Sequence, residues 1–110
     1  MPFRPSASVV VLVTVPDRAV ATTLADAAVR KRLAACVNLV PGIESVFRWE
    51  GKVDRSQELL LVIKTTKRNF EKLRELLLTL HPYEVPEIIA LPIVAGHPAY
   101  MAWLANAVTA

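Results

Sequence analysis

The chain has 110 residues, of which 54% are apolar, and its formal net charge is +3. This length suits one domain with a hydrophobic core, and the apolar content excludes an intrinsically disordered chain. The basic residues are scattered apart from one triplet, which argues against a nucleic-acid-binding surface, and no apolar stretch approaches the roughly 20 residues of a membrane helix. The excess of apolar residues is therefore expected to be buried within the protein or between subunits.

The first part of the chain predicts a central strand followed by a helix. Residues 1–7 are expected to form a flexible tail, and a single domain is expected over residues 8–110. Ser8 to Val15, SVVVLVTV, is apolar on both alternating faces, which is typical of a strand covered on two sides. Pro16-Asp17 then offers a helix N-cap, and the spacing from Arg18 to Leu33 predicts a helix with a narrow polar stripe.

The middle of the chain predicts a pair of strands and a second helix. ACVNLV at residues 35–40 and IESVFRW at residues 43–49 indicate strand segments separated by a break at Pro41-Gly42. Glu50-Gly51-Lys52 signals a hairpin, and the returning strand from Gln57 to Thr65 is expected to lie beside the first strand. Thr65 or Thr66 can cap the helix that follows, whose apolar side chains recur at helical spacing: Phe70, Leu73, Leu77 and Leu80.

The last part of the chain predicts an edge strand and a short helix. Glu87 to Val94 indicates a strand, and Pro92 within it lacks an amide donor, which favours a sheet edge or a bulge. A third helix follows Gly96-His97-Pro98 and is expected to place Tyr100, Trp103, Leu104 and Ala107 on one side. The whole order is that of an α+β, ferredoxin-like βαββαβ sandwich with an extra C-terminal helix. Both crossover helices of this fold cover one sheet face, and because the other face is also apolar here, we expect several subunits to pack together.

Four segments, in this order and spacing, resemble the CutA divalent-cation tolerance family. They are TVPD at residues 14–17, LAACVNLVPGIESVFRWEGKV at residues 33–53, ELLLVIKTT at residues 58–66 and HPYEVPEI at residues 81–88. The resemblance covers nearly the whole chain, from Val9 to about Leu104. It implies a subunit assembled into a tight trimer like that of the PII signalling proteins. It also implies a cytoplasmic role in metal tolerance with proposed copper binding, and no enzymatic activity.

Four residues are the candidate ligands for copper or another divalent cation: His81, Glu84, Glu87 and Cys36. No cofactor is expected to be required, so such a metal would be an optional ligand. Imidazole is a common ligand for copper and zinc, and a cysteine thiolate suits Cu(I). Each group also has a structural interpretation. The His81 ring can end the second helix by bonding a nearby carbonyl or carboxylate, and Cys36 can behave as a small buried apolar side chain. Bacterial family members with proposed copper ligands carry a cysteine and a second histidine where this chain has Val13 and Leu80.

Five further residues are candidates for a ligand cleft or a subunit interface: Trp49, Lys64, Tyr83, Glu58 and Arg48. Lys64 lies inside an apolar strand and should need a carboxylate partner, for which Glu58 and Glu87 are the candidates. Tyr83 is expected to pack at a cleft or subunit boundary, where prolines on either side set the direction of the chain. An aromatic residue at a hairpin end, such as Trp49, is more typical of an interface than of a binding platform.

Three functions are compatible with these residues. The first is a trimer that serves metal tolerance, and the second is a PII-like sensor that binds a small anionic ligand between subunits through Lys64, Arg48 and Tyr83. The third is a non-catalytic scaffold trimer. No nucleophile stands at a fixed spacing from an acid or base, so an enzyme is not predicted. Neither nucleic acid nor membrane is an expected partner, and the single cysteine, Cys36, favours the reducing cytoplasm.

Overall fold

Four antiparallel strands form one sheet in the computed structural model, which describes residues 7–110. The strands are β1 (Ser8–Val15), β2 (Cys36–Trp49), β3 (Lys52–Thr66) and β4 (Ile88–Pro92), in the spatial order β2-β3-β1-β4. The helices are α1 (Arg18–Arg30), α2 (Lys67–Leu80) and α3 (Pro98–Ala107). This arrangement confirms the predicted α+β, ferredoxin-like order with an added C-terminal helix, and it confirms that the first and third strands are central.

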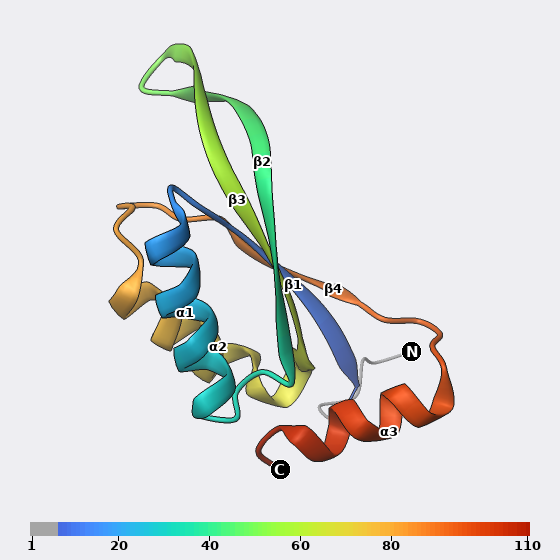
Figure 1. Ribbon diagram of the computed structural model, residues 1–110. Helices are drawn as coiled ribbons and strands as arrows, with labels where there is room; N and C mark the ends of the chain where they lie inside the picture. Colours follow the sequence, from blue (N-terminus) through green and yellow to red (C-terminus); the bar gives the residue numbers. More distant parts are fainter. Residues whose placement is uncertain (1–6) are drawn as a thin grey trace.

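The hydrophobic core lies between the sheet and the first two helices, which stand together on one side of it (Figure 1). Because side chains alternate along a strand, β1 sends Val11 and Val13 to this side, where both are fully buried. They pack with Leu61 of β3 and with Leu24 and Leu73 from the two helices, all without solvent exposure. At about 2 kcal/mol for each large apolar side chain removed from water, this core stabilises the sandwich.

Helix α1 begins as predicted but ends three residues earlier than the sequence pattern suggests. Asp17 is its N-cap, and the side-chain Oδ1 accepts a 2.9 Å hydrogen bond from the Val20 amide. At the other end, Arg32 adopts a left-handed backbone with φ of 58°, and the Leu33 amide donates to the Ala28 carbonyl at 3.0 Å. This closing turn resembles the caps in which glycine is the usual residue, so apolar spacing alone could not locate the end of the helix.

The second and third strands form a long hairpin that extends beyond the rest of the sheet (Figure 1). The expected break at Pro41-Gly42 is a bulge within one continuous strand, because the register shifts between Val40 and Ile43. The predicted hairpin turn is confirmed, with Glu50 and Gly51 both at positive φ between the paired residues Trp49 and Lys52. Strand β3 therefore starts at Lys52 instead of Gln57, since its polar first part is recruited by pairing with β2.

The C-terminal elements differ in detail from the prediction. Strand β4 lies at the sheet edge beside β1, as Pro92 indicated, but it is shorter than the predicted Glu87–Val94. In α3, Leu104 is fully buried and Ala107 packs beside it, whereas Tyr100 and Trp103 are 39% and 47% exposed, so the four residues of the expected side differ in burial. The buried side of α3 is set by its contacts with a small second core instead, which contains Ala35, Ile93, Met101, Ala107 and Val108.

The sheet face away from α1 and α2, called the open face below, is apolar across all four strands. The register places seven apolar residues on it: Val10, Leu12, Val40, Leu60, Val62, Ile89 and Leu91. Those on the central strands are half-buried, while Val40, Ile89 and Leu91 are 39%, 49% and 48% exposed. Helix α3 lies at the end of the sheet opposite the hairpin tip and packs against β1 and β3 (Figure 1). Most of the open face therefore remains uncovered by the helices.

Residues 1–6 of the expected flexible tail lie outside the described residues, and the Ala7 carbonyl accepts a 2.8 Å hydrogen bond from the Lys67 amide. Within residues 7–110, none of the helices combines the length and the hydropathy needed to cross a membrane.

Candidate functional site

The segment HPYEVPEI connects α2 to β4, and His81 fixes its first turn. Pro82 favours an extended conformation at the preceding residue, and His81 has ψ of 133°. The His81 ring is 8% exposed; Nε2 lies 2.8 Å from the Thr14 carbonyl oxygen, and Nδ1 accepts a 3.1 Å hydrogen bond from the Tyr83 amide. Because Nδ1 accepts, the proton belongs on Nε2, which donates to Thr14. The prediction that this ring bonds a nearby carbonyl is confirmed.

Tyr83 continues the network from His81 to a buried carboxylate on β3. Its ring packs against the imidazole with centroids 4.7 Å apart, and its hydroxyl donates a 2.6 Å hydrogen bond to Glu58 Oε2. Burial, reinforced by this bond and by the charge of Glu58, raises the pKa of Tyr83 above its ordinary value of 10.0. The phenol therefore stays protonated and remains a donor at neutral pH.

Glu58 is deeply buried and has no cationic partner among residues 7–110. It is 7% exposed, and its one recorded hydrogen bond comes from the neutral hydroxyl of Tyr83. The ion pairs recorded within the described part of the chain lie elsewhere, between Arg55 and Glu44 and between Arg74 and Glu71. A buried carboxylate without a counter-charge costs free energy, and such groups concentrate at functional sites.

These side chains border a cleft of about 750 Å³ between the hairpin and the segment that leads into β4. On the hairpin, Ser45 and Phe47 lie opposite Ser56 and Asp54, so the register brings all four to the same sheet side as Glu58. The charged groups of the lining are four carboxylates and one guanidinium: Asp54, Glu58, Glu84, Glu87 and Arg48. The aromatic ones are Phe47, Trp49 and Tyr83. The cleft is therefore acidic, with aromatic walls.

Most of the predicted site residues meet at this cleft. Six of them line it: Trp49, Tyr83, Glu58, Arg48, Glu84 and Glu87. His81 contacts it through Tyr83. The confirmed cleft position of Tyr83 follows from the proline-flanked segment, whereas Asp54 was missed because the polar start of β3 was not predicted as a strand. Asp54 and Ser56, which line the cleft from this part of β3, could have been found from the sequence. Pairing the two strands across the predicted hairpin turn places Asp54 opposite Phe47, on the same sheet side.

Cys36 and Lys64 lie together at the other end of the open face, away from the cleft. They are directly paired across β2 and β3. The expected carboxylate partner of Lys64 is wrong, because Nζ donates a hydrogen bond to Asn38 Oδ1. Glu58 lies six residues away on the same strand, which is roughly 20 Å at about 3.3 Å per residue. The Cys36 Sγ lies 3.6 Å from the Tyr100 hydroxyl, and this contact raises the pKa of Tyr100.

The donor groups of one subunit do not fit a tight copper site. In residues 7–110, no three His, Cys, Asp or Glu side chains are close enough together to hold a metal ion. Both ring nitrogens of His81 already have hydrogen-bond partners, and Cys36 is placed at the opposite end of the open face. Soft-metal binding in a single subunit would therefore require rearrangement of the His81 network.

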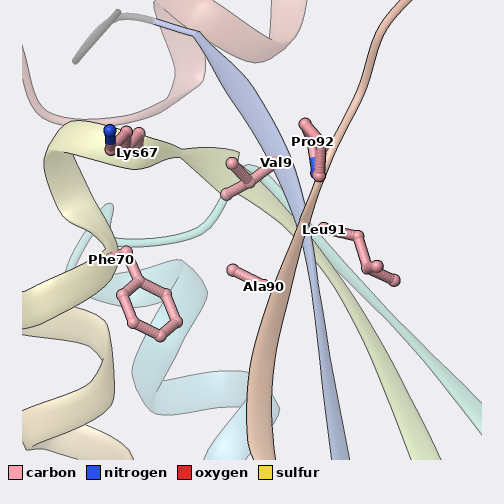
Figure 2. Close-up of a pocket in the computed structure, with 6 residues that line it drawn as sticks. All are labelled: Val9, Lys67, Phe70, Ala90, Leu91 and Pro92. Atoms are coloured by element: carbon pink, nitrogen blue, oxygen red, sulfur yellow. The ribbon is translucent and has the colours of Figure 1, made fainter. Parts of the chain in front are cut away.

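A second, smaller hollow of about 380 Å³ lies beside the edge strand and the start of α2. Figure 2 shows Ala90 on the side of the strand that faces Phe70 and Val9, with Leu91 on the opposite side. Lys67 and Pro92 complete its lining. Apart from Lys67, the described lining is apolar and contains no acid, thiol or imidazole that could serve as a metal ligand.

Comparison with known proteins identifies the family. Residues 9–107 match the family model described as CutA1 divalent ion tolerance protein. The chain is 58% identical over 95 residues to a divalent-cation tolerance protein CutA of Thermus thermophilus, covering 86% of this chain and 92% of the relative. It is 54% identical over 99 residues to a chloroplastic CutA of Arabidopsis thaliana, covering 90% of this chain and 54% of that relative. The solved structure of a Cut A1 protein from Thermus thermophilus has a TM-score of 0.91 and 54% identity, covering 93% and 99% of the two chains. The chain belongs to the CutA1 divalent ion tolerance family.

Proposed function

We propose that this protein serves divalent-cation tolerance as a non-catalytic homotrimer. The family supports the tolerance role, since the Thermus thermophilus relative is named a divalent-cation tolerance protein. The observation that carries the trimer is the open face, on which apolar side chains from all four strands are left without cover by α1 and α2. The number of three subunits follows from the family resemblance, which implies a trimer like that of the PII signalling proteins.

Burial of the open face supplies the driving force for association. Val40, Ile89 and Leu91 each expose between 39% and 49% of their surface. Covering a few hundred Å² of such surface stabilises the assembly by roughly 25 cal/mol per Å², or several kcal/mol per subunit before association costs. A soluble monomer rarely leaves an apolar patch of this size in water.

The assembly is tested by placing a charge on the open face. Val62→Lys puts an ammonium group among half-buried apolar residues of a central strand, whereas Val94→Lys changes the same residue type at a position that is 92% exposed. Sedimentation equilibrium at micromolar concentration should give three chains for the wild type and for Val94→Lys, and smaller species for Val62→Lys. A monomeric wild type, or a Val62→Lys protein that remains trimeric, would contradict the proposal.

For the metal itself, we propose weak divalent-cation binding at Glu84 and Glu87 on the rim of the cleft. Both are exposed carboxylates that line the same cleft as the buried Glu58, and their oxygens suit cations that tolerate hard ligands. Calorimetry with Cu(II) and Zn(II) should give weak heats that are lost in a double Glu84→Gln, Glu87→Gln variant and kept in Glu75→Gln. Undiminished heats in the double variant would reject this assignment, and a loss only in His81→Ala or Cys36→Ser would favour those residues.

A cytoplasmic location is part of the proposal, supported by the single unpaired Cys36. The Arabidopsis thaliana relative is named chloroplastic, so fractionation of cells with an antibody against this chain is the direct test.

The sensor is the second candidate function, and the cleft favours it over a plain scaffold. The structure does not favour the small anionic ligand that the sequence analysis expected, however. Lys64 lies outside the cleft, and Arg48 shares it with four carboxylates, so the surroundings do not favour an anion. A thermal-shift screen separates sensor from scaffold, because a ligand that binds only the native state raises the melting temperature.

A further inference from the structure

We propose that the end of the helical layer opposite the hairpin tip binds an acidic segment of another protein. The surface concerned, called the basic end below, consists of the closing turn of α1 and the first turn of α2. Its exposed side chains are all cations: Arg30, Lys31, Lys67 and Arg68. This binding needs neither a metal nor the cleft.

The basic end exists only in the folded chain, because its two helix ends are far apart in the sequence. Strands β1 and β3 are antiparallel, with Ser8 opposite Thr66. Helix α1 runs back along β1, and α2 starts where β3 ends, so the two helix ends meet at the same end of the sheet (Figure 1). Thr65 Oγ1 joins them by donating a 2.6 Å hydrogen bond to the Leu33 carbonyl. The basic triplet visible in the sequence is thereby enlarged by cations of the second helix.

Carboxylates are absent from this end of the molecule. The segments that meet there contain neither Asp nor Glu: residues 27–37, 63–70 and 98–110. The acids closest to them in the sequence are Asp26 and Glu71, and the Glu71 carboxylate already accepts a 2.7 Å hydrogen bond from Arg74. All ten Asp and Glu residues of the chain therefore lie outside these segments.

Three of the four cations have no partner of their own. Within residues 7–110, no ion pair or side-chain hydrogen bond is recorded for Arg30, Lys31 or Arg68. Like charges that are close together repel one another, and the repulsion is reduced only partly by water and salt. A partner that brings several negative charges to this surface would relieve it.

The dipoles of the helices explain only half of the basic end. Arg30 and Lys31 stand at the C-terminus of α1, where the partial negative charge of a helix favours cations. Lys67 and Arg68 stand in the first turn of α2, where the partial positive charge favours acids, and that turn contains none. The second pair therefore opposes the stability of its helix, which points to a role in binding.

The basic end stays accessible when other subunits cover the open face. Helices α1 and α2 lie on the opposite side of the sheet, so subunits that dock on the open face approach from the side away from these cations (Figure 1). Neither of the two hollows described above is lined by Arg30, Lys31 or Arg68. The surface is thus suited to an extended partner and not to an enclosed small molecule.

The side chains of the basic end favour carboxylates on a protein segment over other polyanions. Guanidinium groups bind carboxylates through paired hydrogen bonds, and the ammonium groups add charge without a fixed geometry. The four cations include no aromatic ring on which the bases of a single strand could stack. They also lack the apolar side chains or acyl chain that a basic surface needs for stable attachment to a membrane.

A peptide of ten glutamates, labelled with fluorescein, is the probe for such a segment. Its fluorescence anisotropy is titrated with the native assembly in the presence of a chelator, and a peptide of ten glutamines is the neutral control. We expect saturable binding of the glutamate peptide, which weakens when salt rises from about 50 mM to about 200 mM, and none of the glutamine peptide. No binding of the glutamate peptide at the lower salt would overturn the proposal.

Charge removal at the basic end locates the binding. The triple variant Arg30→Gln, Lys31→Gln, Arg68→Gln should bind the glutamate peptide at least about tenfold more weakly, at roughly threefold for each exposed ion pair lost. Glutamine is a good helix former, so both helices should be kept.

A matched variant removes the same number of charges from the other end of the molecule: Arg18→Gln, Lys52→Gln, Arg55→Gln. Its net charge equals that of the first variant, and its affinity should stay within about twofold of the wild type. Equal losses in both variants would show that net charge alone attracts the peptide, and would reject the basic end. Should a triple variant fail to assemble, Lys31→Glu and Lys52→Glu make the same comparison with one reversed charge each.

Two competitors decide the class of partner. Vesicles of phosphatidylcholine with phosphatidylserine, and a single-stranded oligonucleotide, are each added to the complex with the glutamate peptide. We expect weaker binding of both at equal concentrations of negative charge. Tighter binding of either one, lost in the triple variant of the basic end, would assign this surface to lipid or nucleic acid and overturn the assignment to an acidic protein segment.

Discussion

Replacing His81 by alanine should destabilise the protein by about 3 kcal/mol. The substitution removes the hydrogen bond to the Thr14 carbonyl and the one accepted from the Tyr83 amide. Leaving a buried donor or acceptor without a partner costs about 1–3 kcal/mol, and two such groups lose their partner here. The ring is 8% exposed and packs against Tyr83, so its contact is lost as well, while water entering the space reduces the total.

The other histidine provides the matched control. His97 is exposed and makes no side-chain capping bond at the start of α3, so His97→Ala should change stability by less than about 0.5 kcal/mol. His81→Asn keeps an acceptor near the position of Nδ1, and His81→Gln keeps a donor near that of Nε2. Each should recover about half of the loss, since each restores one of the two hydrogen bonds.

Urea unfolding in the presence of a chelator measures these differences, at one protein concentration because assembly contributes to stability. The corresponding fall in melting temperature is roughly 10 °C for His81→Ala. If His81→Ala and His97→Ala unfolded at the same urea concentration, the structural role of His81 would be refuted. If His81→Ala also abolished the heat of metal binding, the ring would be a ligand and not only a structural link.

Three further predictions concern other parts of the fold. Because the folded state raises the pKa of Tyr83, it holds the phenol proton more tightly than the unfolded chain; this stabilisation is complete below the ordinary value of 10.0 and is lost as the pH rises above it. Stability between pH 9 and pH 11 should therefore fall more steeply in the wild type than in Tyr83→Phe, as measured by urea unfolding; parallel pH profiles would contradict this. Asp17→Ala should lower the free energy of unfolding by about 1 kcal/mol, because it removes the N-cap hydrogen bond of α1. Asp26→Ala, on the exposed face of the same helix, should lower it by less than about 0.5 kcal/mol in the same urea assay, and equal losses would contradict the capping role of Asp17. Gly51→Ala should cost about 1 kcal/mol by calorimetric unfolding, because Gly51 has φ of 79° in the hairpin turn; a neutral result would show that the turn readily changes its conformation.

The order of elements could be predicted because the signals that define it are local. An apolar run such as Ser8–Val15, a proline-aspartate cap and a helical repeat each depend on residues close together in the chain. The same holds for the edge position of β4, which follows from the missing amide of Pro92. Six residues of the cleft lining were also predicted, three of them, Tyr83, Glu84 and Glu87, because polar and aromatic groups around two prolines stand out against an apolar sequence.

What only the tertiary structure decided is how distant residues pair. Lys64 bonds to Asn38 because the register of β2 and β3 brings the two side chains together. Glu58 bonds to Tyr83, 25 positions further along the chain, because the segment after α2 returns past β3. The first half of β3 is a strand only because β2 pairs with it, and α1 ends where Arg32 turns to the left-handed conformation. Composition and periodicity along one chain do not report such long-range contacts, whose free energy depends on the positions of both partners.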